Sequence, residues 1–430
     1  MKFDESSLYN IKSDLDGTRC SLFDLATWKN GLAFKKIDFS ETGRPVIKIA
    51  ELNNGINSNT SFTQGNYGED VYIRWDDLLF SWSGNPQTSI DVFRYRLQDG
   101  WLNQHIFKVT ANEELVTKDF LYYVLKFLKP YFTQIATNKQ TTGLGHVTIA
   151  DLKRMSLVVP SKEVQNQIVS ILKAIDDKIE VNTNINENLQ AQVKALFHAM
   201  FISSADRFGW ENGTFSDLIE STLGGNWGKE SPTGNNTEMV YCIRGADIPE
   251  VKAGNKGKMP TRYILPKNYA AKRLLPGDIV VEISGGSPTQ STGRVAAISQ
   301  SLLDRYDKGM VCTNFCRAIK PKSGYSMFVY YYWQYLYDRN VFFSYENGTT
   351  GIKNLDLSGF VTTEEIVIPP FELIQKFDDY CQIVFDQTFA NGLENEQLSN
   401  LRDTLLPQLM SGEHSQSPDA WVRSSRKDIG

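Results

Sequence analysis

The stretch "TTGLGHVTIADLKRMSLVVP" at residues 141–160 returns in altered form as "TTGIKNLDLSGFVTTEEIVIPP" at residues 349–370. Both copies begin with Thr-Thr-Gly, continue into a strand-like apolar run and end at proline. Each is followed by a long segment with helical periodicity. A junction that occurs twice, far apart in one chain, predicts an internal duplication.

The spacing that superimposes Gly143 on Gly351 extends the match upstream without a gap. It places "FLYYVLKFL" (120–128) on "FVYYYWQYL" (328–336), and both patterns predict a buried, aromatic-rich helix. One spacing therefore links an aromatic helix, a polar loop and the repeated junction.

Two earlier landmarks repeat in the same order. "DDLLFSWSGNPQTS" (76–89) corresponds to "PGDIVVEISGGSPTQS" (276–291), and each predicts a turn, a short buried strand and a polar, glycine-rich loop. "FDLATWKNGLAFKK" (23–36) corresponds to "SDLIESTLGGNWGK" (216–229) in an alignment that pairs the glycine at 31 with the glycine at 224. The spacings between landmarks drift, which indicates two copies of one fold with divergent loops.

The segments that follow each copy predict long helices. Residues 162–202 contain no proline or glycine, and apolar residues recur every three or four positions, as they do in residues 371–410. Both apolar seams become polar in the middle, at "VNTNINEN" (181–188) and at Ala-Asn-Gly (390–392). Buried asparagines that fix the register of a coiled coil explain this pattern, and so does a splayed or water-filled middle.

The expected fold class is α+β: two homologous globular domains, each followed by a long helix, with the helices pairing as an antiparallel coiled coil. Such pairing would set the globular domains at opposite ends of a rod. The expected segments are a first globular domain (1–160), a central long helix (161–203), a second globular domain (204–369), a C-terminal long helix (370–412) and a polar tail (413–430).

Charge, metal-ligand spacing and hydropathy limit the classes of function that the chain could have. Net charge is −5 over 430 residues, and nearly all of the acidic excess lies after residue 370, so each globular half is neutral and able to present a basic face. The five cysteines are scattered, and neither they nor the four histidines have a metal-ligand spacing, so we expect no metal and no cofactor. No apolar run is long enough to span a bilayer and the start of the chain has no secretory pattern, so we expect a cytoplasmic protein with no membrane partner.

Taken together, these features resemble the specificity subunit of type I restriction–modification systems. The residues that carry the resemblance are "GDIVV" with Ser284-Gly285, "YCIRGADI" (241–248), both Thr-Thr-Gly junctions, the entries "LVVPSKEVQNQI" and "VIPPFELIQKF", and "LLPQLMSGE" (405–413). The chain departs from the family where Trp75-Asp76-Asp77 stands in place of Pro-Gly-Asp, and in the helix entries, where the family usually shows Glu-Gln.

This resemblance implies that residues 1–160 and 204–369 are target-recognition domains, each of which reads one half of a split, double-stranded DNA target, and that residues 161–203 and 370–412 are spacer helices. The helices then act as a ruler and dock methyltransferase subunits, and through them restriction subunits. Successive major-groove faces on one side of B-DNA recur about every 34–36 Å, which suits two reading domains held apart by helices.

Loop chemistry supplies the candidate DNA-binding residues. Lysines after glycine-rich loops suit phosphate contact, whereas polar loop side chains and arginine suit base edges. For each residue, a solvated loop or a structural turn is the competing interpretation. The candidates are Lys35, Lys36, Arg74, Gln87, Thr88, Lys139, Lys229, Arg244, Gln290, Thr292, Arg294 and Lys353.

Catalysis by this chain is not expected. "IPPF" (368–371) resembles the Pro-Pro-aromatic motif of adenine methyltransferases, but isoleucine stands where that chemistry needs Asn or Asp. Asp278 and Glu282 lack the lysine of a nuclease site, and we interpret Asp278 as a turn residue. The alternative to a DNA-reading subunit is a tandem-repeat scaffold that binds proteins through its long helices. The target sequence, the stoichiometry and the presence of a restriction subunit cannot be predicted from the chain.

Overall fold

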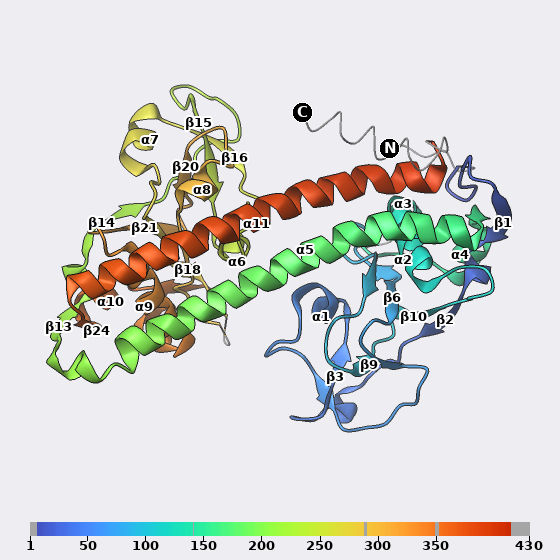
Figure 1. The fold of residues 1–430 in the computed structure, drawn as a ribbon, viewed down its shortest axis with the longest axis horizontal. Coiled ribbons are helices and arrows are strands. Elements are labelled where there is room, and N and C mark those ends of the chain that lie inside the picture. Colours follow the sequence, from blue (N-terminus) through green and yellow to red (C-terminus); the bar gives the residue numbers. More distant parts are fainter. Residues whose placement is uncertain (1–6, 141, 288–289, 349–351, 414–430) are drawn as a thin grey trace. The chain divides into compact units, whose positions relative to one another are not determined.

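The computed structural model describes residues 7–140, 142–287, 290–348 and 352–413, and these form two compact units (Figure 1). Of these described residues, unit 1 comprises those within 7–176 and 400–413, and unit 2 comprises those within 177–399. Each long helix contributes one segment to each unit.

The centre of unit 1 is a four-stranded antiparallel sheet. Its strands lie in the order β2 (Ala26–Asn30), β10 (Ile106–Ala111), β6 (Leu78–Ser81) and β8 (Asp91–Arg94). The aromatic helix predicted from the sequence is α2 (Lys118–Phe127), which starts at the Thr117 cap and leads into α3 (Lys129–Asn138). Because every residue of β6 is buried, this strand anchors the core of the unit.

Unit 2 repeats this sheet strand for strand. The order is β14 (Ile219–Gly224), β21 (Cys316–Pro321), β17 (Ile279–Glu282) and β19 (Val295–Ala297). The aromatic helix is α9 (Ser326–Asp338), in which nine residues are buried. The prediction of two copies of one fold is therefore confirmed.

Three smaller pairings are duplicated as well. A strand that enters each unit pairs with the strand before the long helix: β1 (Gly17–Ser21) with β12 (Ser156–Pro160), and β13 (Glu211–Thr214) with β24 (Glu365–Ile368). A small second sheet contains one parallel pair in each copy, namely β3 (Arg44–Ile47) with β9 (Gly100–Leu102), and β15 (Glu238–Ile243) with β20 (Met310–Cys312). Antiparallel neighbours complete these sheets, which are β4 (Phe62–Thr63) and β5 (Tyr72–Ile73) in unit 1 and β16 (Thr261–Ile264) in unit 2.

A bulge in β14 corrects one detail of the sequence alignment. The register of β14 against β21 shifts between Ile219 and Ser221, so this strand holds one residue more than β2. Beyond the bulge, Gly31 therefore corresponds to Gly225 rather than to Gly224. At both glycines a Cβ would lie within 2.2 Å of a carbonyl oxygen on the neighbouring turn, so no side chain fits. Close backbone approach explains why both copies keep glycine at this place.

The departure at Asp76 has a structural explanation. Asp76 has a φ of 74° and Gly277 has a φ of 91°, so both copies need the left-handed conformation at the same turn. Asp76 is tolerated there because Arg94, Arg96 and Lys118 contact its carboxylate at 2.7–3.2 Å. Burial alone would raise the pKa of Asp76, but these hydrogen bonds and charges lower it to about 2.

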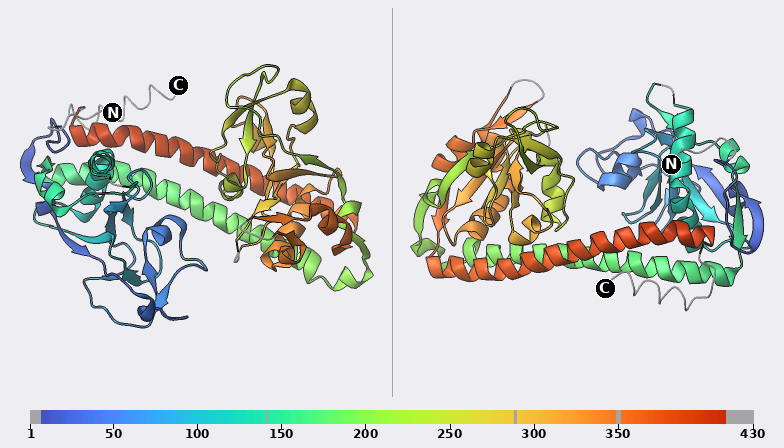
Figure 2. Two further views of the ribbon diagram at one scale, coloured as in Figure 1. Left: turned by 180° about the vertical axis from the view of Figure 1, so that it is seen from behind. Right: turned by 90° about the horizontal axis from the view of Figure 1, so that it is seen from above.

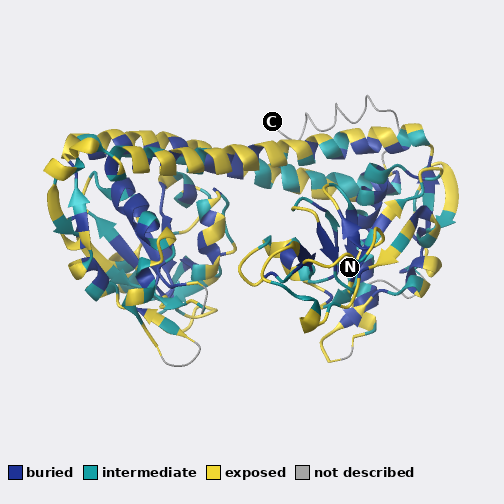
Figure 3. Cartoon of the chain, turned by 90° about the horizontal axis from the view of Figure 1, so that it is seen from below, coloured by how far each residue is buried: buried dark blue, intermediate teal, exposed yellow. Residues whose placement is uncertain are grey.

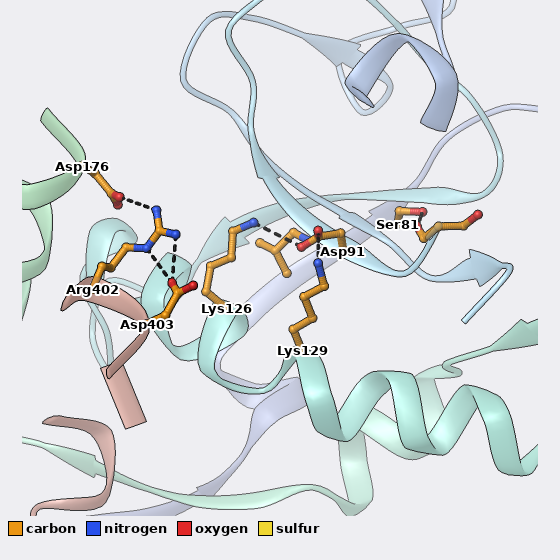
Figure 4. A network of polar contacts seen from close by, with 9 residues as sticks. Ser81, Asp91, Lys126, Lys129, Asp176, Arg402 and Asp403 are labelled. Carbon is orange, nitrogen blue, oxygen red and sulfur yellow. Dashed lines mark hydrogen bonds and ion pairs between the residues drawn. The ribbon is translucent and has the colours of Figure 1, made fainter. Parts of the chain in front are cut away.

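The long helices are α5 (Lys162–Phe197), which continues as a π-helical turn through Ile202, and α11 (Phe371–Ser411). Within unit 1, Arg402 of α11 binds Asp176 of α5 at 2.9 Å (Figure 4). Within unit 2, Asn182 of α5 donates to Asn395 of α11. Residue numbers rise along one helix as they fall along the other, so the pairing is antiparallel in each unit, as predicted (Figure 2).

The polar middle of the seam is a hydrogen-bonded network. Asn186 and Asn391 are buried, and Asn391 donates to the Asn186 side-chain oxygen at 2.8 Å. Asn182, only 1% exposed, donates to Glu394 at 2.7 Å. Because these buried amides bond directly to one another and to neighbouring groups, the structure favours specific pairing over a splayed or water-filled middle.

Buried residues concentrate in the sheets and on the inner faces of the helices (Figure 3). Within the described ranges, no helix is long and apolar enough to cross a membrane.

Candidate nucleic-acid interface

The two landmarks identified in the sequence meet in space. The Ser-Gly segment β7 (Ser83–Gly84) pairs with β11 (Gly145–His146), directly after the first Thr-Thr-Gly junction. Likewise, β18 (Ser284–Gly285) pairs with β23 (Lys353–Leu355), after the second junction. Each unit thus brings two polar loops together at the same place. Thr141 and residues 349–351 of the junctions lie outside the described residues.

In unit 2 this place holds two ion-paired clusters. Arg294 donates two hydrogen bonds, both 2.7 Å long, to the buried carboxylate of Glu282, and they raise the pKa of Arg294. Glu346 accepts from the backbone and hydroxyl of Thr292 and from Lys353 at 2.7 Å. The polar groups of these three candidates, Thr292, Arg294 and Lys353, are therefore already engaged within the chain.

Side chains that remain exposed lie at the tips of the loops. Gln87 and Thr88 are exposed, and the Asn85 side chain caps their turn by accepting from both backbone N–H groups. Gln290 occupies the corresponding loop of unit 2 and is also exposed. These amides and hydroxyls have the donors and acceptors that base edges require.

Three of the lysine candidates lie on other loops. Lys35 and Lys36 are exposed at the start of the short helix η2 (Lys36–Asp38), beside Ile37, which is 90% exposed. Lys229 is exposed and forms a two-way backbone bridge to Tyr263 of β16. No described contact brings these lysines to the Ser-Gly loops.

The other three candidates carry intrachain partners. The guanidinium of Arg74 lies 4.3 Å from the centre of the Tyr72 ring and pairs with Glu69 at 2.9 Å. Arg244 pairs with the buried Asp247 at 2.9 Å.

Lys139 lies between α3 and the turn that starts α4 (Ile149–Arg154). Its ammonium contacts the buried carboxylate of Asp151 at 2.5 Å. Burial would raise the pKa of Asp151, but hydrogen bonds from Lys139 and Thr148 lower it. Lys139 thus satisfies a buried charge.

The structure reveals surface residues that the sequence patterns did not single out. Phe315 is 62% exposed, and its carbonyl accepts from Ile283 and Ser284, so it lies beside the Ser-Gly segment. Arg44 lies 5.0 Å from the Tyr72 ring that Arg74 also contacts. An aromatic or arginine outside a recognised motif gives no sequence signal, because its exposure depends on the fold.

Corresponding positions in the two units differ in charge. In unit 1, Asp91 takes the place in the sheet that Arg294 takes in unit 2, and its carboxylate binds Lys126 and Lys129 (Figure 4). Burial would raise the pKa of Asp91, but the two ammonium groups hold it below its ordinary value. The surroundings of the two loop pairs are therefore chemically distinct, although the backbone scaffold is shared.

Comparison with known proteins agrees with this duplicated architecture. A family model described as "Type I restriction modification DNA specificity domain" matches residues 18–191. The type I restriction enzyme HindI specificity subunit of Haemophilus influenzae is 23% identical over 410 residues, which cover 74% of this chain and 83% of that protein. The MjaIX specificity subunit of Methanocaldococcus jannaschii is 24% identical over 326 residues, which cover 69% of each chain.

A solved structure shares the fold. The S subunit of a type I restriction–modification system from M. genitalium has a TM-score of 0.52 at 16% identity, with 95% of this chain and 98% of that chain covered. The duplicated sheet and the paired long helices define a two-copy α+β fold, which this S subunit shares. In sequence, the chain is similar to the specificity subunits of type I restriction–modification systems.

Proposed function

We propose that this chain is the non-catalytic subunit that reads the DNA target of a type I restriction–modification enzyme. Each copy of the repeat reads one half of a bipartite, double-stranded sequence. The supporting observation is that each unit joins the same two polar loops at the same place in the fold, whereas the side chains around those loops differ. Equivalent scaffolds with different loops suit two different half-targets.

The exposed loop residues are the strongest candidates for DNA contact. Gln87, Thr88 and Gln290 present hydrogen-bonding groups to solvent, and Lys35, Lys36 and Lys229 present ammonium groups for phosphates. The hydrogen-bonded Thr292 and the ion-paired Arg74, Arg244, Lys139, Arg294 and Lys353 stay as candidates that would have to exchange or share an intrachain partner.

The functional segments follow the repeat. Recognition domains at residues 1–160 and 204–369 are joined by spacer helices at 161–203 and 370–412, with a polar tail at 413–430. The tail lies outside the described residues apart from Glu413. In this proposal the helices set the gap between half-targets and dock the methyltransferase subunits, which in turn hold the restriction subunits, in the cytoplasm where the chromosome lies.

A genome-wide map of N6-methyladenine tests the proposal directly. The map is compared between cells with and without this chain, with the partner methyltransferase present in both. A motif of two specified blocks around an unspecified gap should disappear on deletion. An unchanged map, with a soluble and expressed methyltransferase, would support the protein-binding scaffold instead.

Paired loop variants sharpen this experiment. Substituting Gln87 and Thr88 by alanine should relax base preference in one block only, and Gln290→Ala should affect only the other block. Because all three side chains are exposed, the substitutions leave the core unchanged. Equal loss of both blocks in every variant would contradict the assignment of one half-target to each unit.

A further inference from the structure

In unit 2, the short helix α6 (Ile248–Lys252) and the loop that follows it contact the paired long helices at their polar middle. The Asn186 side-chain amide donates to the carbonyl of Ala253 at 3.1 Å and to that of Thr388 at 3.0 Å. Its oxygen accepts from Asn391 at 2.8 Å. One buried asparagine thus connects α5, α11 and the α6 loop.

The backbones themselves touch at this place. A Cβ on Gly392 of α11 would lie 1.9 Å from the carbonyl oxygen of Gly254, and a Cβ on Gly254 would lie 2.4 Å from the carbonyl oxygen of Thr388. Gly254 has a φ of 85°, a conformation that favours glycine. Glycine at both positions therefore permits a close approach of the two backbones that any side chain would prevent.

The side chains of Arg305 and Gln190 donate hydrogen bonds to carbonyl groups of the same loop. Arg305 donates to the Gly254 carbonyl at 2.9 Å and pairs with Glu396 of α11 at 2.5 Å. Gln190 of α5 donates to the carbonyl of Lys252. The carbonyls at the end of α6 thus find partners on the long helices or on a residue paired to them, which matches the need of a helix end for acceptors to be satisfied.

In the described part of unit 1, the corresponding glycine is not packed in this way. The short helix α1 (Ile49–Asn54) of unit 1 also follows a strand of the small sheet and also ends at a left-handed glycine, Gly55 with a φ of 74°. A Cβ on Gly55 would meet no atom within 4 Å. The packed glycine in unit 2 is therefore a feature of that unit and not a requirement of the repeated fold.

We propose that the α6 loop is an anchor that fixes the second recognition sheet on the spacer helices, with Asn186 and Gly392 as positioning residues that set which gap the bipartite target must have. This inference rests on the proposed function. The anchor acts through β15, which is joined to α6 by the short 3-10 helix η6 (Gly245–Asp247) and belongs to the small sheet whose edge strand β16 bridges to Lys229. Loosening the anchor would let this sheet shift against the helices without changing any loop side chain.

The test uses the full chain in complex with its methyltransferase subunits. Gly392→Ala and Asn186→Ala are compared with wild type and with Gly209→Ala, a control in which the new Cβ meets no atom within 4 Å. Methylation is measured on DNA libraries that hold both half-targets constant and vary the gap in single base pairs. Hydrogen exchange of the amides at residues 248–254 reports the anchor independently of DNA.

We expect both anchor variants to exchange these amides at least tenfold faster and to methylate additional gap lengths, with the bases of each half-target unchanged. Gly209→Ala should match wild type. If Gly392→Ala does not fold, Asn186→Ala, which removes atoms and adds none, carries the test. Faster exchange with an unchanged gap profile would overturn the positioning role, as would unchanged exchange. Absence of any bipartite methylation by wild type would instead contradict the proposed function.

Discussion

Replacing Arg294 by methionine separates two roles for this residue, a structural ion pair and a reader of guanine. Glu282 has a side chain only 8% exposed, and Arg294 holds both of its oxygens at 2.7 Å. Gly245 lies so close that a Cβ there would fall 2.3 Å from a Glu282 oxygen. The carboxylate therefore has little room to turn toward solvent once its partner is removed.

The expected cost follows from this geometry. Removing one partner of a buried ion pair costs about 3–5 kcal/mol, and because Arg294 is itself 24% exposed, we expect about 2–3 kcal/mol here. Glu282→Gln should cost about 1–2 kcal/mol, since it loses the charge but keeps the shape. The double variant should cost less than the sum of the single variants by about 1.5–2 kcal/mol, because the remaining carboxylate is then no longer left unpaired.

Urea unfolding of the full chain, followed by tryptophan fluorescence and by circular dichroism, measures these free energies if the two probes give coincident transitions. A DNA-binding titration on the same variants measures base preference. Single variants that lose less than about 0.5 kcal/mol would refute the structural role. Loss of preference for one G·C pair at unchanged stability would establish Arg294 as the base reader instead.

Three further changes test other parts of the molecule. The double variant Lys35→Ala/Lys36→Ala should bind all DNA sequences more weakly, and the slope of log K against log salt concentration should fall by about 2. Anisotropy titrations between about 50 and 200 mM salt measure this slope. A loss of binding confined to one sequence would contradict phosphate contact. Asp76→Asn should lower the free energy of unfolding by about 1 kcal/mol at pH 7, after allowance for the 35% exposure of the Asp76 side chain. Because the pKa of Asp76 is lowered to about 2, this difference should vanish as the pH falls from about 4 to 2. A difference in thermal unfolding that does not depend on pH would contradict a role for the Asp76 charge. Gly225→Ala should cost more than about 3 kcal/mol, because its Cβ would lie 1.8 Å from the Thr313 carbonyl, and a melting temperature equal to wild type would contradict that close approach.

The sequence was sufficient to predict the duplication because several of its landmarks are imposed by local backbone geometry. Asp77 and Asp278 each accept a backbone N–H three residues back, in turns that enter the equivalent buried strands β6 and β17. Glycine at 31 and at 225 is required by close carbonyls. Such constraints survive divergence, so they remain visible in a single sequence.

The alignment error at β14 shows a limit of matching the two copies by sequence alone. A bulge adds one residue to a strand without adding any recognisable residue type, so an ungapped alignment passes through it unnoticed. The correspondence of Gly31 with Gly224 was wrong for that reason. Only the pairing of β14 with β21 reveals the shift.

Pairing between distant residues limits the prediction of the site. Glu282 lies in the quoted segment and Arg294 follows three residues after its end, yet nothing in their spacing shows that they bind each other. The two strands that bring them together are joined by a loop whose length differs between the two copies. The same limit applies to Lys139 with Asp151. A loop composition identifies residues able to contact DNA, whereas the fold decides which of their polar groups remain available.

The polar middle of the long helices shows both what a helical pattern can predict and what it cannot. Asparagines in an apolar seam indicated that the seam is specialised, and the sequence offered register control or a loose middle as explanations. In unit 2, Asn186 serves a third group, the Ala253 carbonyl of a loop 67 residues away. A heptad pattern describes only helix against helix, so it contains no information on a loop that packs against both of them. Where a coiled-coil seam turns polar beside a small residue such as Gly392, the neighbouring globular domain is therefore the first place to seek the missing partner.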